Sequence, residues 1–329
     1  MKAVLCKAYG PPESLTFEEI ESPAIGRSGV RIGVHACGVN FPDVLIIKGE
    51  YQFKPPFPFS PGAEVAGVVL EVGSDVTNIA VGDRVIGMTG WNGFAEEVVV
   101  DAAKCLKMPA NMDFATGAAI PMTYGTSYHA LVQRAQLVAG ETLLVHGATG
   151  GVGTAAVEIG KLLGAKVIAT GGSDEKLQAL QKLYGIEHVL NYKSDSNWKD
   201  RVKELTGGNG ADVVYDPVGG DVFEQSLRCI NWNGRLLVIG FASGAIPAAK
   251  ANLILLKGCA VVGVFWGAFS ARDPGLNAKN FEQLLRWFEA GSLKPAISHR
   301  FPLERAADAL NAIQRREVVG KAVLLTSRN

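Results

Sequence analysis

Four glycines fall within seven residues of the segment "HGATGGVG", which begins at His146. Glycine loses more conformational freedom on folding than any other residue, so this density needs a reason. The preceding residues are typical of a strand and the following ones of a helix. Without side chains at such a turn, a ligand can lie against the backbone, where the free N–H groups and the positive dipole end of the helix attract an anion. The turn therefore predicts phosphate binding by Gly150, Gly151 and Val152.

The surrounding elements indicate which phosphate compound binds there. Strand-like and helix-like segments alternate six times from "ETLLVHG" to "CAVVGVF", and the strands are nearly continuous runs of Val, Ile and Leu. This alternation is typical of a Rossmann-type α/β fold with a doubly wound parallel sheet. In that setting the glycine turn predicts dinucleotide binding, although its spacing, Gly147-x-x-Gly150-x-x-Gly153, departs from G-x-G-x-x-G. The alternative is a glycine turn that serves packing alone.

The end of the second strand bears on the identity of the dinucleotide. NAD-binding sites usually carry Asp or Glu there, but this strand ends in "TGGSDEK". The absence of a carboxylate leaves room for a 2′-phosphate, for which Ser173, Lys176 and Tyr192 could supply donors and positive charge. We therefore predict NADPH rather than NADH, while Lys176 has the alternative of an exposed lysine in the first turn of a helix.

Composition shifts along the chain predict its domains. Short strand-like runs broken by Gly and Pro fill the first third and indicate a β-rich, partly barrel-like domain. The segments after about residue 266 leave the alternation, and they are too short to fold alone. We expect a first domain over residues 1–121, a nucleotide domain over 122–265, and a return of residues 266–329 to the first domain.

The totals exclude several classes of protein. The 329 residues carry 32 basic and 32 acidic side chains, and this balance argues against binding to nucleic acid or a membrane surface. No apolar run approaches the length of a membrane span, and the N-terminus does not resemble a signal peptide. Five scattered cysteines form no C-x-x-C motif. We expect reduced thiols, no bound metal and a cytoplasmic protein.

Several segments resemble one family in matching order along nearly the whole chain, among them "GVNFPDVLIIKGEY", "PGAEVAGVVLEVG", "GATGGVG", "DPVGGDVFEQSL" and "GKAVLL". The chain resembles the medium-chain dehydrogenase/reductase superfamily, and within it the zinc-free quinone oxidoreductases related to zeta-crystallin. The resemblance implies a Rossmann domain inserted in a GroES-like substrate domain. It also implies a homodimer, in which the sixth strand can pair with its mate.

The same resemblance bears on metal binding. Zinc-dependent relatives carry a Gly-His-Glu motif where this chain has Gly62-Ala63-Glu64, so the histidine ligand is missing. Cys37 stands at the place of another ligand, but one thiolate without partners makes no zinc site. The four-cysteine structural lobe is also missing, because only Cys105 occurs in that stretch.

The resemblance and the predicted strand ends also single out site residues. The resemblance implies that Asn40 bonds the nicotinamide region or the acceptor and that Tyr51 lies near the substrate, so both are our catalytic candidates. Relatives often have a second tyrosine where this chain has Leu45, so water could also deliver the proton. The further predicted cofactor contacts, by resemblance or because they end the fifth and sixth strands, are Thr126, Phe241, Ser243, Val264, Phe265, Trp266 and Lys321. As a phenol, Tyr124 could also donate a hydrogen bond or a proton, and for both Tyr51 and Tyr124 the alternative is a half-buried aromatic side chain. Asp43 and His146 have plain structural interpretations.

Three functions remain open from the sequence. The first is an NADPH-dependent enzyme that transfers hydride to quinones or related conjugated carbonyl compounds without a metal. The second is an enal, enone or enoyl-CoA reductase on the same scaffold. The third is a non-catalytic protein that binds NADPH or RNA, as some zeta-crystallin relatives do, although zero net charge and the lack of a basic, aromatic patch argue against RNA.

Overall fold

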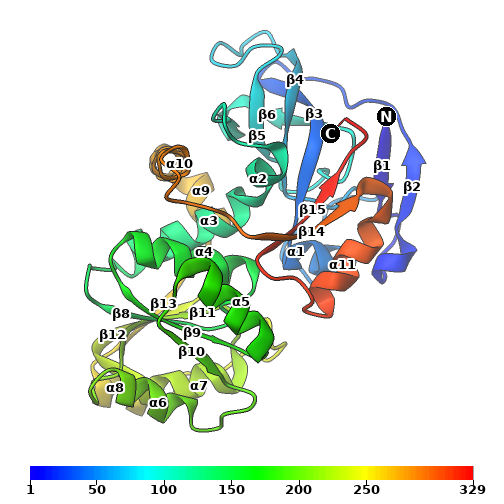
Figure 1. The fold of residues 1–329 in the computed structure, drawn as a ribbon. Helices are drawn as coiled ribbons and strands as arrows, with labels where there is room; N and C mark the ends of the chain where they lie inside the picture. The colour runs from blue at the N-terminus through cyan, green and yellow to red at the C-terminus, as the bar shows by residue number, and fades with distance from the viewer. Residues whose placement is uncertain (329) are drawn as a thin grey trace. The chain divides into compact units, whose positions relative to one another are not determined.

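The computed structural model describes residues 1–328, which form two compact units (Figure 1). The first unit comprises Met1–Met122 and the C-terminal segment that begins at Pro295, and the second comprises Thr123–Lys294. The second unit is thus an insertion in the first. Within the described residues, no helix combines the length and apolar character needed to cross a bilayer.

The second boundary differs from the one that the sequence pattern predicted, because residues 266–294 belong to the nucleotide unit. These residues contain α9 (Trp266–Arg272) and the whole of α10 (Pro274–Glu289). Their side chains pack inside that unit: the Trp266 ring lies against Gly125, and Asn280 exchanges hydrogen bonds with Gln133. The pattern showed only that the strand–helix alternation had ended, which does not indicate where the next helices pack.

The first unit is built on a seven-stranded sheet and a separate two-stranded sheet of β1 and β2. The order in the large sheet is β14-β15-β3-β4-β5-β7, and β6 also pairs with β3. The elements of this unit are β1 (Lys2–Leu5), η1 (Pro12–Ser14), β2 (Thr16–Glu19), β3 (Gly29–Val39), α1 (Phe41–Ile47), β4 (Glu64–Val72), β5 (Arg84–Met88), β6 (Glu97–Asp101), η2 (Ala102–Lys104), β7 (Cys105–Lys107), α2 (Phe114–Ala119), β14 (Ile297–Pro302), η4 (Leu303–Arg305), α11 (Ala306–Gln314) and β15 (Lys321–Leu325).

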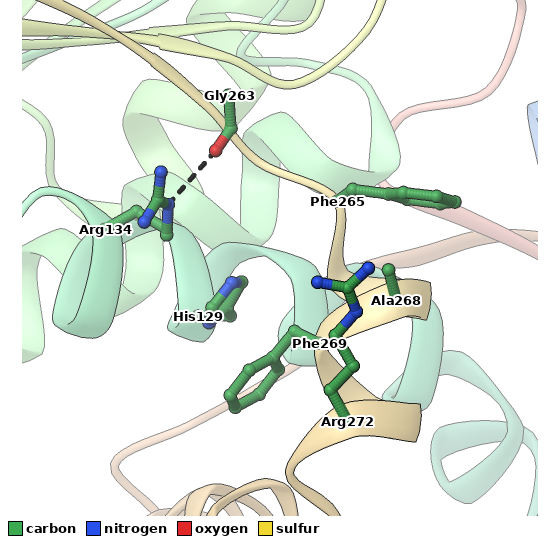
Figure 2. Close-up of a pocket in the computed structure, with 7 residues that line it drawn as sticks. All are labelled: His129, Arg134, Gly263, Phe265, Ala268, Phe269 and Arg272. Atoms are coloured by element: carbon green, nitrogen blue, oxygen red, sulfur yellow. Dashed lines mark hydrogen bonds between the residues drawn. The ribbon is translucent and has the colours of Figure 1, made fainter.

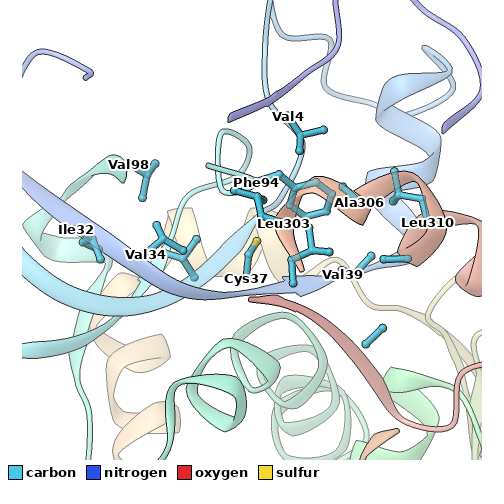
Figure 3. Packing of buried hydrophobic residues seen from close by; sticks show 14 of the residues in the cluster. Val4, Ile32, Val34, Cys37, Val39, Phe94, Val98, Leu303, Ala306 and Leu310 are labelled. Carbon is cyan, nitrogen blue, oxygen red and sulfur yellow. The ribbon is translucent and has the colours of Figure 1, made fainter. Parts of the chain in front are cut away.

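The C-terminal strand β15 joins this unit to the start of the chain. It lies antiparallel to β3, with Ala322 opposite Val39. The core beneath it combines side chains from both ends of the sequence, such as Ile32, Phe94 and Leu310 (Figure 3). The fold therefore places Lys321, the first residue of β15, beside the end of β3.

The second unit confirms the predicted Rossmann-type sheet. Its six parallel strands have the order β10-β9-β8-β11-β12-β13, with helices on both faces (Figure 1). The elements are α3 (Pro121–Tyr128, which starts in the first unit), the π-helix η3 (His129–Arg134), β8 (Thr142–Val145), α4 (Gly151–Leu162), β9 (Lys166–Gly171), α5 (Asp174–Tyr184), β10 (His188–Asn191), α6 (Trp198–Leu205), β11 (Ala211–Asp216), α7 (Gly220–Cys229), β12 (Ile230–Val238), α8 (Ala251–Lys257), β13 (Ala260–Gly263), α9 and α10. The order reverses between β8 and β11, which is where ligands bind in such sheets.

Candidate active site

The glycine turn lies between β8 and α4, and its glycines serve two purposes. Gly147 has a left-handed φ of 53°, and a Cβ on Gly153 would lie 2.2 Å from the Gly147 carbonyl oxygen, so both are required by the turn itself. Gly150 is the N-cap of α4, and a Cβ there would meet only the Gly147 oxygen, at an ordinary 3.4 Å. The protein thus leaves open a space at Gly150 that a side chain would fill, next to the first N–H groups of α4. This geometry fits the predicted phosphate contact.

The ends of β9 and β10 bring together the residues predicted near a 2′-phosphate. Asn191, the last residue of β10, pairs with Gly171, and the Tyr192 N–H donates to the Gly171 carbonyl at 3.1 Å. Ser173 is the N-cap of α5, and its hydroxyl accepts the Lys176 N–H at 3.4 Å. The sequence had not indicated this capping role. Ser173, Lys176 and Tyr192 are all half-buried, and their contact with a cofactor stays a prediction.

The residues after β12 and β13 divide into exposed and buried side chains. Phe241 and Phe265 expose 40% and 48% of their surface, and Ser243 is also exposed. Trp266 instead packs into the unit and donates its indole N–H to the Asn277 side chain at 3.0 Å. The strand β13 ends at Gly263, so Val264, Phe265 and Trp266 follow the sixth strand rather than end it.

Helix α3 is tied to the first turn of α4. The Ser127 hydroxyl donates to the Val152 carbonyl at 2.9 Å and lies 2.8 Å from the Tyr215 hydroxyl. This contact holds the half-buried Thr126, a predicted cofactor contact, on a helix fixed to the glycine turn. Sequence reasoning missed Ser127, although its place beside Thr126 was a usable signal.

A cavity of about 300 Å³ lies in the second unit at the end of β13 (Figure 2). Its walls combine aromatic rings with two arginines: the His129 and Phe269 rings stack with centroids 3.9 Å apart, and Arg134 donates Nε–H to the Gly263 carbonyl at 3.1 Å. The lining residues are His129, Arg134, Gly263, Phe265, Ala268, Phe269 and Arg272. Of the predicted site residues, only Phe265 lines this cavity.

The first unit contains a buried group of charged side chains that joins Asn40 to Lys321. The Lys321 ammonium donates to Asn40 Oδ1 at 2.6 Å and to Glu64 Oε1 at 2.7 Å, and Asn40 Nδ2 donates to the same Glu64 oxygen at 2.7 Å. Exposed fractions are 6% for Asn40, 1% for Glu64 and 2% for Lys321. The Lys321 contacts are thus to this chain's own oxygens, and a cofactor contact by Lys321 stays a prediction. Sequence reasoning used Glu64 only as the third residue of the altered metal motif.

Asp43 completes this buried region. Its carboxylate accepts the Asn40 N–H at 2.7 Å and the Gly62 N–H at 3.1 Å, which supports the predicted structural role of fixing the loop. Burial raises the pKa of Asp43 to about 7, against the lowering effects of these hydrogen bonds and of Lys321. Burial, and then the charge of Asp43, raises the pKa of Tyr51, so the half-buried phenol keeps its proton at neutral pH.

The residues around Cys37 do not fit a zinc site. The Cys37 thiol is buried and donates to the Glu64 carbonyl at 3.0 Å, and burial raises its pKa well above the usual value. The Glu64 carboxylate, which follows the missing histidine ligand in the sequence, forms an ion pair with the Lys321 ammonium at 2.7 Å. Within residues 1–328, no three His, Cys, Asp or Glu side chains are grouped so that they could hold a metal ion.

Comparisons with known proteins agree with both units. The model of the alcohol dehydrogenase GroES-like domain matches residues 26–110, and that of the zinc-binding dehydrogenases matches residues 151–290. A protein of Nematostella vectensis named quinone oxidoreductase-like protein 2 homolog is 43% identical over 330 residues, which cover 99% of this chain and 89% of that protein.

Two solved structures are similar over the whole chain. Escherichia coli quinone oxidoreductase complexed with NADPH superposes with a TM-score of 0.90 at 29% identity, over 99% of this chain and 100% of that one. The CurK enoyl reductase has a TM-score of 0.89 at 28% identity, over 99% of both chains.

Proposed function

The chain belongs to the quinone oxidoreductase family of the medium-chain dehydrogenase/reductase superfamily, and from that premise we propose that it is an NADPH-dependent reductase of quinones or related conjugated carbonyl compounds. The observation that carries the proposal is the open space at Gly150 beside a second strand that ends without a carboxylate. The first feature suits a pyrophosphate, and the second suits a phosphorylated ribose.

The second unit provides the proposed cofactor contacts. Gly150, Gly151 and Val152 would offer the main-chain N–H groups of the first turn of α4, whereas Ser173, Lys176 and Tyr192 would surround the 2′-phosphate. The remaining contacts proposed in this unit are Thr126, Phe241, Ser243, Val264, Phe265 and Trp266, whereas Asn40 of the first unit is proposed to contact the acceptor. Bound NADPH would supply the hydride.

The first unit provides the proposed hydrogen-bond donors to the acceptor. Hydride addition to a conjugated carbonyl compound leaves negative charge on an oxygen, which a preorganised donor stabilises. Asn40 offers a carboxamide N–H, and the protonated Tyr51 offers a hydroxyl that makes no hydrogen bond within the described residues. A donor of this kind stabilises the developing charge without a metal.

We propose that the reaction needs no zinc, since the donor set around Cys37 and Glu64 does not fit that ion. Dialysis against a chelator followed by metal analysis and a steady-state assay tests this point. Unchanged turnover is expected. A loss of turnover that zinc restores would contradict it.

An enoyl reductase is the second candidate, and the cavity at the end of β13 is the observation in its favour. Arg134 and Arg272 line it without an acidic residue, which suits the phosphates of a CoA thioester. Parallel assays with a naphthoquinone, 2-alkenals and crotonyl-CoA separate the two candidates. We expect NADPH-dependent turnover of the quinone. Fast turnover of an enoyl substrate together with inactivity toward the quinone would overturn this expectation. No oxidation of NADPH with any acceptor would favour a non-catalytic protein.

We also propose a homodimer formed along β13. This strand is at the edge of the parallel sheet, and apolar side chains near it are exposed, with exposed fractions of 65% at Trp232, 79% at Leu255 and 71% at Leu256. Light scattering of the wild type and of Leu255→Glu/Leu256→Glu tests it, and a dimer that becomes a monomer is expected. A wild type that is monomeric at micromolar concentration would overturn it.

The five cysteines, all within the described residues, are free and buried. This supports our proposal of a reducing, cytoplasmic environment.

A further inference from the structure

The Lys321 ammonium is held by three acceptors. Besides Asn40 Oδ1 and Glu64 Oε1, it contacts the Val39 carbonyl oxygen at 3.2 Å. Its three protons therefore have three partners, and the side chain is fixed in one position. The free-energy cost of removing two charges from water can exceed the attraction between them, so a buried ion pair contributes little to folding stability. We therefore consider a role of this ion pair in the reaction.

The contacts of Lys321 and Glu64 orient the Asn40 carboxamide. Its oxygen accepts from a cation, whereas its nitrogen donates to a carboxylate. Exchange of the two atoms would place N–H groups against the ammonium and an oxygen against the carboxylate, so the amide has one orientation. One Nδ2–H is used by Glu64, and the second makes no hydrogen bond within the described residues.

Glu64 is held in place by three hydrogen bonds. Its Oε1 accepts from Lys321 and Asn40, and its Oε2 accepts the Met122 N–H at 2.7 Å. It therefore balances the charge of Lys321. The two residues form a neutral pair, with the positive member on the amide oxygen of Asn40.

A cation on an amide oxygen draws electron density from the amide nitrogen and strengthens its remaining N–H as a donor. We propose that Lys321 is a positioning residue that orients and polarises Asn40, so that the second Nδ2–H donates to the acceptor oxygen on which negative charge develops. This inference rests on the proposed function. It assigns to one polarised amide the electrostatic part that a metal plays in zinc enzymes.

The test is a double-mutant cycle on quinone reduction. Lys321→Met keeps the length of the side chain but removes the charge, and Asn40→Ala removes the donor. Each single variant should lower kcat by about 10²-fold, and the double variant should be no worse than Asn40→Ala, because Lys321 acts through Asn40. The KM for NADPH should stay within about twofold if the loss arises at the acceptor. The exposed Lys104→Met is the matched control and should keep the wild-type kcat.

Two further measurements separate positioning from folding. Lys321→Met leaves the buried Glu64 carboxylate without its counter-ion. The double variant Lys321→Met/Glu64→Gln, which removes both charges, is therefore tested as well. The same loss of kcat is expected, with a wild-type circular dichroism spectrum. In the protein without cofactor or acceptor, the NMR signals of the Asn40 side-chain amide protons should lie upfield in this double variant relative to the wild type.

The outcomes distinguish this inference from the function on which it depends. Wild-type kcat in Lys321→Met, independent losses that multiply in the double variant, or an unmoved Asn40 signal would overturn the positioning role while leaving the reductase intact. A wild type without turnover of any conjugated acceptor would instead overturn the proposed function.

Discussion

The Tyr124 hydroxyl donates a hydrogen bond to the Glu158 carboxylate of α4 at 2.6 Å, and both side chains are buried in the nucleotide unit. The other Glu158 oxygen accepts the N–H of Lys294, the last residue of that unit. The helix that begins at the glycine turn is thereby bonded to the chain segments that enter and leave the unit. Tyr124 thus has the structural role that its sequence context indicated.

Tyr124→Phe should destabilise the nucleotide unit by about 1–3 kcal/mol, because a buried carboxylate loses a hydrogen-bond donor. Urea unfolding followed by circular dichroism measures the change. Tyr128→Phe, at a half-buried phenol on the same helix, is the control and should change stability by less than about 0.5 kcal/mol. Equal effects of the two variants would contradict the role of the Glu158 hydrogen bond.

His146 should make folding stability depend on pH below neutrality. Burial lowers the pKa of His146 to about 3, so the folded state resists the proton that the unfolded chain accepts near pH 6.5. Its stability contribution is present above pH 6.5 and is lost as the pH falls toward 3, by about 1.4 kcal/mol per pH unit. Urea unfolding at pH 7.5, 6 and 5 should show His146→Gln losing less stability than the wild type. Parallel curves would refute this.

Asp43 should act in the opposite direction. Its folded pKa of about 7 lies above the usual value, so its contribution to stability is complete below about pH 4 and is lost as the pH rises through 7. The wild type should therefore lose stability relative to Asp43→Asn between pH 4 and pH 8. In the wild type, the pH-dependent stability contributions of His146 and Asp43 oppose each other over much of this range. Each contribution is therefore measured as the difference between the wild type and the corresponding variant. A constant difference between the two proteins would exclude a raised pKa at Asp43.

Gly150→Ala should weaken NADPH binding by about tenfold without unfolding the protein, because the added Cβ meets no close protein atom but fills the space proposed for the pyrophosphate. Isothermal titration calorimetry measures the affinity. Gly26→Ala, where a Cβ meets nothing within 4 Å, is the control and should bind as the wild type does. Unchanged affinity in Gly150→Ala would place the phosphates elsewhere.

Ser173→Asp should shift the coenzyme preference from NADPH toward NADH. Asp caps a helix as well as Ser does, so α5 should persist, while the new carboxylate repels a 2′-phosphate. We expect kcat/KM for NADPH to fall by at least tenfold and that for NADH to rise or stay level. Ser173→Asn, which caps without charge, should keep the preference for NADPH. A Ser173→Asp enzyme with an unchanged preference would show that the phosphate lies away from α5.

The sequence by itself determined the Rossmann sheet, the glycine turn and the strand that lacks a terminal carboxylate. These features depend on local spacing, on the period of apolar residues and on glycine, which act over a few residues. The same locality explains why the pattern found β13 but extended it past Gly263, and why it assigned the residues of α9 and α10 to the first domain although they belong to the second unit.

Only the tertiary structure decided which distant polar residues meet. Asn40 and Lys321 are 281 positions apart, yet the pairing of β15 with β3 brings the Lys321 ammonium to 2.6 Å from the Asn40 amide, with Glu64 from β4 completing the group. The identity of a lysine does not reveal whether it is buried, because its burial depends on a partner charge supplied by another strand. Strand pairing sets that contact, and no local pattern encodes it.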